Sequence, residues 1–162
     1  MPFEHQDIAP EDGAPLARIV FPGTPYAVRQ ALAALIGGPI MGSVPEAERG
    51  TAELVLAEAL NNIVEHAYAQ GPGDIEVTIR RVQGDLDCRI VDMGLPMPGD
   101  DPPQGQLPVQ DPDDLPEGGF GWFLIRTLSR DLRYARKGCS NELTFRLDAG
   151  QSVGDGTTVS HL

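Results

Sequence analysis

Cysteine is scarce in this sequence, with only Cys88 and Cys139 among 162 residues. The two form neither a CxxC pair nor a metal-ligand cluster, so we expect free thiols in a reducing compartment. Long apolar runs are also missing. No stretch approaches the roughly 20 apolar residues of a membrane span, and the N-terminal MPFEHQDIAP lacks the apolar core of a signal peptide. We therefore expect a cytoplasmic protein that does not enter a membrane.

Basic residues are outnumbered two to one, 12 Lys and Arg against 24 Asp and Glu, which gives a net charge of −12. Such a charge repels phosphate backbones and anionic lipids, so generic nucleic-acid or membrane-surface binding is excluded. Five basic residues nevertheless gather near the end of the chain: Arg126, Arg130, Arg133, Arg136 and Lys137. We interpret them as a solvated helix and strand edge, with a local cationic patch as the alternative.

Length and composition indicate one ordinary globular domain. A chain of this size buries enough surface to fold without metals or disulfides. Many of the 19 glycines and 15 prolines crowd into residues 93–121, which predicts a long irregular segment there. We expect a flexible arm over residues 1–15, the domain over 16–148, a lid at about 97–117, and a flexible tail over 149–162.

Hydrophobic periodicity indicates the order β-α-α-β-β-lid-α-β-β. Leu56, Leu60, Ile63 and Ala67 share one stripe of the second helix, with polar residues on the opposite side. Helices not interleaved with parallel strands favour an α+β fold, a two-layer sandwich with helices on one face of a mostly antiparallel sheet. The expected strands are 16–21, 75–80, 86–91, 132–136 and 142–147, with a turn at Gly84-Asp85, and the expected helices run from Pro25 to Gly37, from Ser43 or Pro45 to about Gln70, and over 122–130.

Glu58 and Asn62 lie four residues apart on the polar face of the second predicted helix, and His66 follows one turn later. An amide oxygen suits Mg²⁺, which takes one or two protein oxygens beside phosphate oxygens and water. A neighbouring carboxylate can accept a proton from an attacking hydroxyl. Taken alone, such residues are more often simply solvated.

Two glycine motifs follow along the chain. Asp92-x-Gly94 ends a strand, where the acid can accept a hydrogen bond from an amino group and the glycine allows a ligand ring to approach. Gly118-Gly119-Phe120-Gly121 leads into a helix, where exposed N–H groups and the helix dipole favour a phosphate. Alone, the first motif is more often an ordinary strand-ending turn, and the second is a hinge as often as a phosphate site.

Together, in this order, the motifs resemble the N, G1 and G2 boxes of the GHKL ATPases, which have the Bergerat ATP-binding fold. The details look like the anti-sigma-factor serine kinases of the RsbW and SpoIIAB type, and the likeness covers roughly Ile19 to Leu147. It rests on the segments EALNNIVEHAY from Glu58, VDMGLP from Val91 and DLPEGGFGWFLIR from Asp114, extended by Tyr134 and Asn141-Glu142-Leu143.

The resemblance implies a serine/threonine-protein kinase with ATP and Mg²⁺ as cofactors. It makes Glu58 the general base, Asn62 the Mg²⁺ ligand and Asp92 the reader of the adenine amine. It also implies an anti-sigma factor that commonly dimerises, binds a sigma factor and phosphorylates a STAS-domain antagonist. The other implied nucleotide-binding residues are His66, Gly94, Gly118, Gly119, Phe120 and Gly121.

The sequence departs from this family at Glu117, where some relatives have arginine, and at Trp122, which replaces a smaller aliphatic residue. Lys137 and Arg126 are candidates for the missing cation near the γ-phosphate. One alternative is an ATP-binding interaction module without kinase activity. A histidine kinase half is disfavoured because no phosphoacceptor-histidine helices precede the motifs, and a purely structural domain would require three chance motifs.

Overall fold

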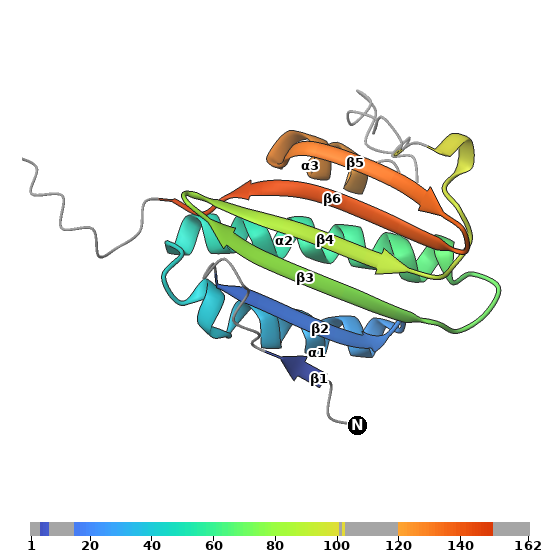
Figure 1. Ribbon diagram of the computed structural model, residues 1–162, viewed down its shortest axis with the longest axis horizontal. Coiled ribbons are helices and arrows are strands. Elements are labelled where there is room, and N and C mark those ends of the chain that lie inside the picture. Colours follow the sequence, from blue (N-terminus) through green and yellow to red (C-terminus); the bar gives the residue numbers. More distant parts are fainter. Residues whose placement is uncertain (1–3, 7–14, 101, 103–119, 151–162) are drawn as a thin grey trace, which may run out of the picture.

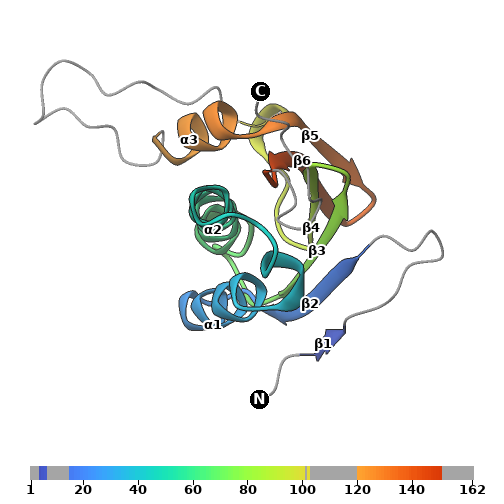
Figure 2. The same cartoon turned by 90° about the vertical axis from the view of Figure 1, so that its left-hand side faces the viewer.

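The computed structural model describes residues 4–6, 15–100, 102 and 120–150. They form a six-stranded sheet of order β1-β2-β3-β4-β6-β5 in which all neighbours are antiparallel. All three α-helices lie on one side of this sheet (Figure 1 and Figure 2). The expected two-layer α+β sandwich is therefore confirmed. The strands are β1 (Glu4–Gln6), β2 (Leu16–Pro22), β3 (Asp74–Val82), β4 (Asp85–Asp92), β5 (Arg130–Lys137) and β6 (Ser140–Asp148).

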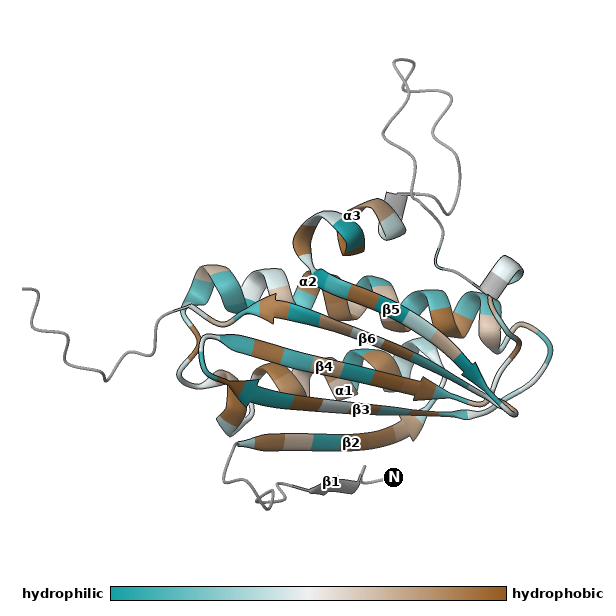
Figure 3. Cartoon of the chain, turned by 45° about the horizontal axis from the view of Figure 1, so that its top comes forward, coloured by the Kyte–Doolittle hydropathy of each residue, from teal (hydrophilic) through white to brown (hydrophobic). Residues whose placement is uncertain are grey.

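Strict alternation of apolar and polar residues determines which side of each strand is buried. In β4, Leu86, Cys88 and Ile90 point toward the helices, and charged residues between them point away. The same alternation runs along β2, β3 and β6, and the alternating bands are visible in Figure 3. The core therefore lies between the inner face of the sheet and the helices, while no described helix or strand covers the outer face.

The first two helices begin at expected signals. In α1 (Pro25–Ile36) the Thr24 hydroxyl accepts a hydrogen bond from Ala27 N at 3.1 Å, and Gly37 ends the helix. The short 3₁₀ turn η1 (Pro39–Met41) leads to α2 (Glu46–Asn62), which packs against α1 on one side and α3 (Phe120–Leu128) on the other. No helix in the described ranges is long and apolar enough to cross a membrane.

The second helix differs from the prediction at its end. It is α-helical only to Asn62 and continues as the π-helix η2 (Ile63–Ala67), so it stops short of Gln70. Tyr68 N donates to Ile63 O, five residues back, at 3.0 Å. A π turn accommodates one extra residue per turn, which shifts the side chains of η2 relative to the line from Glu58 through Asn62. His66 therefore follows Asn62 through a π turn and not through a regular α-helical turn.

Other boundaries also move. The β3–β4 turn consists of Gln83 and Gly84, because Asp85 already pairs with Val82, and Gln83 takes the positive φ of 56°. Residues 4–6 of the predicted arm form β1, which pairs with β2. Ala149, at the start of the predicted tail, is buried, and its N–H donates to Gly84 O. The last helix is α3, which begins and ends two residues before the predicted 122–130.

Candidate functional site

The polar face of α2 meets the first turn of α3. A Cβ added to Gly121 would lie 2.5 Å from Glu58 Oε2 and 3.8 Å from Asn62 Nδ2, so the glycine backbone rests directly on these two side chains. Asn62 Nδ2 is buried and has no hydrogen-bond partner in the described part of the chain. Three residues that the sequence motifs singled out are thus brought together between two helices.

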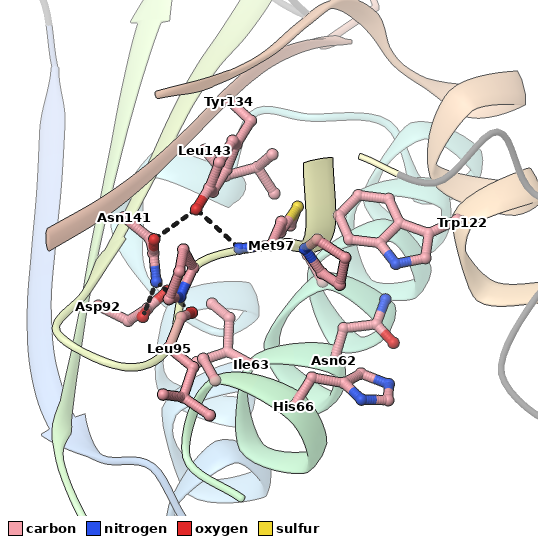
Figure 4. A pocket seen from close by; sticks show the side chains of 14 residues that line it. Asn62, Ile63, His66, Asp92, Leu95, Met97, Trp122, Tyr134, Asn141 and Leu143 are labelled. Carbon is pink, nitrogen blue, oxygen red and sulfur yellow. Dashed lines mark hydrogen bonds between the residues drawn. The ribbon is translucent and has the colours of Figure 1, made fainter. Parts of the chain in front are cut away.

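A cavity of about 280 Å³ opens beside this contact, between α2, the loop that follows β4, and strands β5 and β6. Its wall is mostly apolar, with Trp122 of α3 buried in it at 4% exposure. In Figure 4, Asp92, Asn141 and Tyr134 group at one end of the cavity, whereas Asn62, His66 and Trp122 lie toward the other. The remaining residues that line it are Ala59, Ile63, Ala67, Leu95, Pro96, Met97, Pro98 and Leu143.

Asp92 and Asn141 form the polar end of the cavity. They face each other across the β4–β6 ladder, and each is only 4% exposed. Both side chains point to the inner face of the sheet. The other inward residues, before Asp92 in β4 and after Asn141 in β6, are apolar. Asn141 Nδ2 donates to Asp92 Oδ1 at 2.7 Å, and Gly94 N donates to the same oxygen at 2.9 Å.

A wider hydrogen-bond network holds Asn141 in place. Its Oδ1 accepts from Tyr134 Oη at 2.5 Å and from Arg136 Nη1 at 3.0 Å. Tyr134 Oη in turn accepts from Met97 N at 3.0 Å, and Arg136 Nη1 also donates to Gly94 O at 2.7 Å. The network ties β4, β5 and β6 to the loop over residues 93–97 and fixes the orientation of the Asp92 carboxylate.

Burial raises the pKa of the Asp92 carboxyl above its ordinary value of 3.8, because the charged form loses water. The hydrogen bonds from Asn141 and Gly94 and the nearby Arg136 charge act in the opposite direction without cancelling the effect of burial. The hydrogen bonds from Asn141 and Gly94 both go to Oδ1 of the carboxylate. A buried carboxylate on the wall of an apolar cavity is suited to accept a hydrogen bond from a bound amino group.

In the structure, the packing of the chain explains why residue 94 is a glycine. The sequence had suggested that this glycine allows a ligand ring to approach. A Cβ at this position would lie 2.3 Å from Ala67 O and 2.7 Å from Ala67 Cβ. Leu95 N also donates to Ala67 O at 2.8 Å. Glycine is therefore required because the loop after β4 packs against the backbone of the π turn.

Tyr68 anchors the end of this helical segment. Its hydroxyl accepts from Met93 N at 2.8 Å and donates to Asp74 O at 2.5 Å, which links η2 to both β3 and β4. Its ring fills the space that side chains at Gly23 and Gly73 would occupy. Burial is the main cause of the raised pKa of the Tyr68 hydroxyl.

The remaining candidates lie further from the centre. The side chain of His66 is 67% exposed at the cavity rim. Lys137 lies on the outer face of the sheet and pairs with Glu142, so it does not reach the cavity. Arg126 Nη2 donates to Pro102 O at 2.7 Å. Gly118, Gly119, Glu117 and most of the predicted lid lie outside the described residues, and Phe120 is described only as the first residue of α3.

The roles of Asn141 and Arg136 were not predicted, and Tyr134 and Asn141 entered only through the family resemblance. The sequence did contain a signal for Asn141. Every second residue of β6 from Asn141 on points inward, and Asn141 is polar where Leu143, Phe145 and Leu147 are apolar. A buried polar side chain in an apolar phase requires a partner. In the same way, Asp92 is the one polar residue among the inward-pointing residues of β4.

The donor set of this region fits a nucleotide with its metal. The cavity approaches the lower end of the range of roughly 300–1,000 Å³ that ligand sites span. Asp92 lies at one end of it and Asn62 at the other. Among the described residues no group of three or more His, Cys, Asp or Glu forms a metal site. A magnesium ion bound here would take one amide oxygen from Asn62 beside oxygens of phosphate and water, which is a ligand set that magnesium accepts.

Comparison with known proteins agrees with this arrangement. Residues 21–147 match the family described as the histidine kinase-like ATPase domain. A serine/threonine-protein kinase, BtrW of Bordetella bronchiseptica, is 37% identical over 100 residues, which cover 60% of this chain and 68% of that protein. The serine-protein kinase RsbW of Bacillus thuringiensis is 28% identical over 112 residues, covering 67% of this chain and 70% of RsbW.

A solved histidine kinase domain, from a blue-light activated histidine kinase of Erythrobacter litoralis, is 20% identical and superimposes with a TM-score of 0.49. The superposition covers 74% of this chain and 57% of the kinase chain. The family match spans most of the chain, including α1, α2, η2, α3 and strands β3 to β6 except the last residue of β6. The chain therefore belongs to the histidine kinase-like ATPase domain family, within the GHKL superfamily.

Proposed function

We propose that this protein is an ATP-dependent serine/threonine-protein kinase that binds Mg·ATP in the cavity between α2 and the β4–β6 end of the sheet. The observation that carries the proposal is the buried Asp92–Asn141 pair at one end of a mostly apolar cavity whose other end contains Asn62. The similarity to BtrW and RsbW, which are both protein kinases, supports the same reaction class.

The Asp92 end is suited to the adenine base. Apolar residues such as Ile63, Leu95 and Leu143 would contact the flat faces of the ring. Asp92 would accept a hydrogen bond from the exocyclic amine, and Asn141 would keep the carboxylate in position. Because a buried acceptor left unpaired is costly, this end would discriminate against a base that lacks the amine.

The Asn62 end is suited to phosphates. It lies under the N-terminus of α3, where the helix dipole favours negative charge and Gly121 brings the backbone close to α2. Asn62 would contribute an oxygen to Mg²⁺, while His66 would lie at the rim. Gly118, Gly119 and Phe120 extend the proposed phosphate contacts into the segment that precedes α3.

Glu58 is the proposed general base. ATP supplies the γ-phosphoryl group that is transferred. The Glu58 carboxylate would accept the proton of a serine or threonine hydroxyl and so make its oxygen a better nucleophile. Glu58 lies against Gly121 and beside Asn62, at the phosphate end and away from the adenine end.

The proposed partners follow from the resemblance to anti-sigma-factor kinases. The protein substrate would be a STAS-domain anti-anti-sigma protein, and the second partner would be a sigma factor bound by a homodimer of this chain. Phosphorylation adds nearly two negative charges to the substrate. Since the chain itself carries a net charge of −12, this addition would favour release of the product.

One alternative remains an ATP-binding interaction module that transfers no phosphate. The position of Lys137 favours this alternative, because it pairs with Glu142 on the outer face of the sheet and supplies no cation to the cavity. Arg126 is then the remaining candidate from the sequence for a charge near the phosphates. In this alternative, nucleotide binding would survive and only transfer would be absent.

Calorimetric titration of ATP with and without Mg²⁺ tests the nucleotide site. We expect Mg²⁺-dependent binding that Asn62→Ala abolishes and that Asn61→Ala, an exposed neighbour on α2, leaves intact. Absence of binding at millimolar ATP would overturn the proposal.

Transfer of phosphate to a STAS-domain protein tests the kinase reaction. Glu58→Gln should retain ATP affinity and lose transfer by about 10²-fold or more. ATP binding by wild type without any transfer to STAS-domain proteins would favour the interaction module.

A further inference from the structure

The outer face of the sheet contains a concentration of arginine that the nucleotide site does not use. This face is toward the viewer in Figure 1, and Figure 2 shows every α-helix on the other side. Strand register places two neighbouring rows of residues across it. One row is Arg18, Thr78, Arg89, Thr144 and Arg133, and the next contains Arg80, Asp87, Arg146 and Arg130.

These two rows reverse the charge balance of the rest of the chain. Their six arginines are half of the 12 basic residues of a protein whose net charge is −12, whereas the rows contain a single carboxylate, Asp87. The row through Arg89 has only threonines between its arginines. When the bordering carboxylates are included, the numbers of arginines and carboxylates on this part of the face are equal, whereas the whole chain is strongly acidic. These carboxylates are Glu76, Glu142, Asp85, Asp148 and Asp131. A broad depression lies over the same residues and includes Arg80, Arg89, Arg133 and Arg146.

The arginines of the first row differ in how firmly they are held. Arg18 makes two hydrogen bonds to the Glu76 carboxylate, at 3.2 and 3.1 Å, and both side chains are about one third exposed. Arg89 Nη2 lies 2.9 Å from Glu142 Oε2, and the side chain of Arg89 is 47% exposed. Arg133 is exposed, and no ion pair to it is present among the described residues. An incoming carboxylate can therefore bind Arg133 directly and can compete with Glu142 for Arg89, because an ion pair to an exposed side chain contributes little to stability.

The spacing of the arginines indicates the shape of the partner. Neighbouring strands are about 4.8 Å apart, so arginines on every second strand are separated by about 10 Å. A helix rises about 1.5 Å per residue, so residues seven apart are separated by about 10.5 Å and lie on the same side. A duplex nucleic acid has charges about every 1.7 Å, which matches this row poorly and is repelled by the overall negative charge.

We propose that the outer face of the sheet is a docking surface for an acidic helix of a partner protein. The helix lies across the strands along the row Arg18–Arg89–Arg133 with carboxylates at every seventh residue. The threonines between the arginines provide hydroxyl groups for further hydrogen bonds. Because the nucleotide cavity lies on the opposite side of the sheet, the two surfaces can be occupied together.

The test is fluorescence anisotropy of a labelled alanine-glutamine helix of about three heptads with glutamate at every seventh position. The control probe has glutamine in place of glutamate. We expect the full chain to prefer the acidic helix at low salt. The double variant R89Q/R133Q should weaken this binding about tenfold. The double variant R29Q/R49Q changes the net charge equally on the helix side and should have less than about a twofold effect.

Several results would overturn this inference: no preference for the acidic helix, equal effects of the two double variants, or displacement of the acidic helix by duplex DNA. Dissociation of a homodimer by R89Q/R133Q in sedimentation would also overturn it, because the face would then join two copies. Urea midpoints of both variants report whether they fold. ATP binding measured on the same variants tests the proposed nucleotide site separately.

Discussion

Replacing Asn141 by alanine should destabilise the fold, and the loss should depend on pH. Asn141 is buried beside the Asp92 carboxylate and connects it to Tyr134, Arg136 and the loop after β4. Alanine removes every one of these side-chain hydrogen bonds and leaves Asp92 with the bond from Gly94 N. The buried Asp92 carboxylate then loses the hydrogen bond from the Asn141 amide.

The size of the effect follows from the bonds that are lost. A hydrogen bond to a charged group contributes about 1.5–3 kcal/mol, and a neutral one contributes about 1 kcal/mol. Asn141 donates one bond of the first kind to Asp92 and accepts another from Arg136, and it also has neutral bonds with Tyr134 and with Leu95 O. Arg136 and Tyr134 are only part-buried, so water replaces part of what they lose. Gly94 O keeps its bond from Arg136. We therefore expect the free energy of unfolding to fall by about 3 kcal/mol, a large fraction of the roughly 5–15 kcal/mol of a typical domain.

The pH dependence follows from the pKa of Asp92. The pKa of Asp92 is higher in the folded state than its ordinary value of 3.8, so the protonated carboxyl favours folding. This contribution to the free energy of unfolding is fully present below pH 3.8 and is lost as the pH rises through the folded pKa. The Asn141 bond lowers that pKa, so its removal raises it further. The destabilisation should therefore be largest when Asp92 is ionised and should shrink as the pH falls toward the raised pKa.

Urea unfolding followed by the fluorescence of Trp122, the only tryptophan and a buried one, provides the assay at about pH 8 and at about pH 4, close to the ordinary pKa of the carboxyl. Asn61→Ala on the exposed face of α2 is the control and should change stability by less than about 0.5 kcal/mol. A loss below about 1 kcal/mol for Asn141→Ala, or one equal at both pH values, would refute the reasoning.

Three further predictions concern packing and thiol access. Gly94→Ala should lower the urea midpoint by the equivalent of about 2 kcal/mol, because its Cβ would meet the backbone of Ala67 at 2.3 Å; an unchanged midpoint would contradict this. Gly50→Ala, in α2 with no atom within 4 Å of its Cβ, should raise stability by about 0.5–1 kcal/mol in the same assay, and a loss would count against it. A thiol reagent should modify only the exposed Cys139 in the native protein and both cysteines in denaturant, because burial shields Cys88 and raises the pKa of its thiol; fast native reaction of both would be inconsistent with that burial.

Local patterns were sufficient for most of the fold. Alternation along β3 and β4 predicted both strands, and the Thr24-Pro25 pair predicted the start of α1. The hairpin turn was misplaced by one residue because the glycine was taken as its first position. The structure instead gives the positive φ to Gln83, a residue with no such local preference.

The candidate site was predictable only where its residues share one element. The four-residue spacing of Glu58 and Asn62 was enough to place them on one face of α2. Asp92 and Asn141 lie 49 positions apart, and only the β4–β6 register brings them together. Lys137 could have been excluded, since it lies three positions after the inward Tyr134 and therefore on the other face of the strand.

No local signal marked the π turn. The Tyr68 N–H bonds five residues back, and the loop after β4 packs on the carbonyl of Ala67. These long-range contacts are absent from any window of the helix sequence, so propensity alone predicts an uninterrupted α-helix.

In evolutionary terms, the π turn over Ile63–Ala67 is equivalent to the insertion of one residue into an ordinary helix. If the same residues formed a regular α-helix instead, everything after them would be rotated by about 100°. Ala67 O would turn away from Leu95 N, and Tyr68 would leave the space between Gly23 and Gly73. The wider turn therefore keeps the end of the segment in the orientation that these contacts with the sheet require.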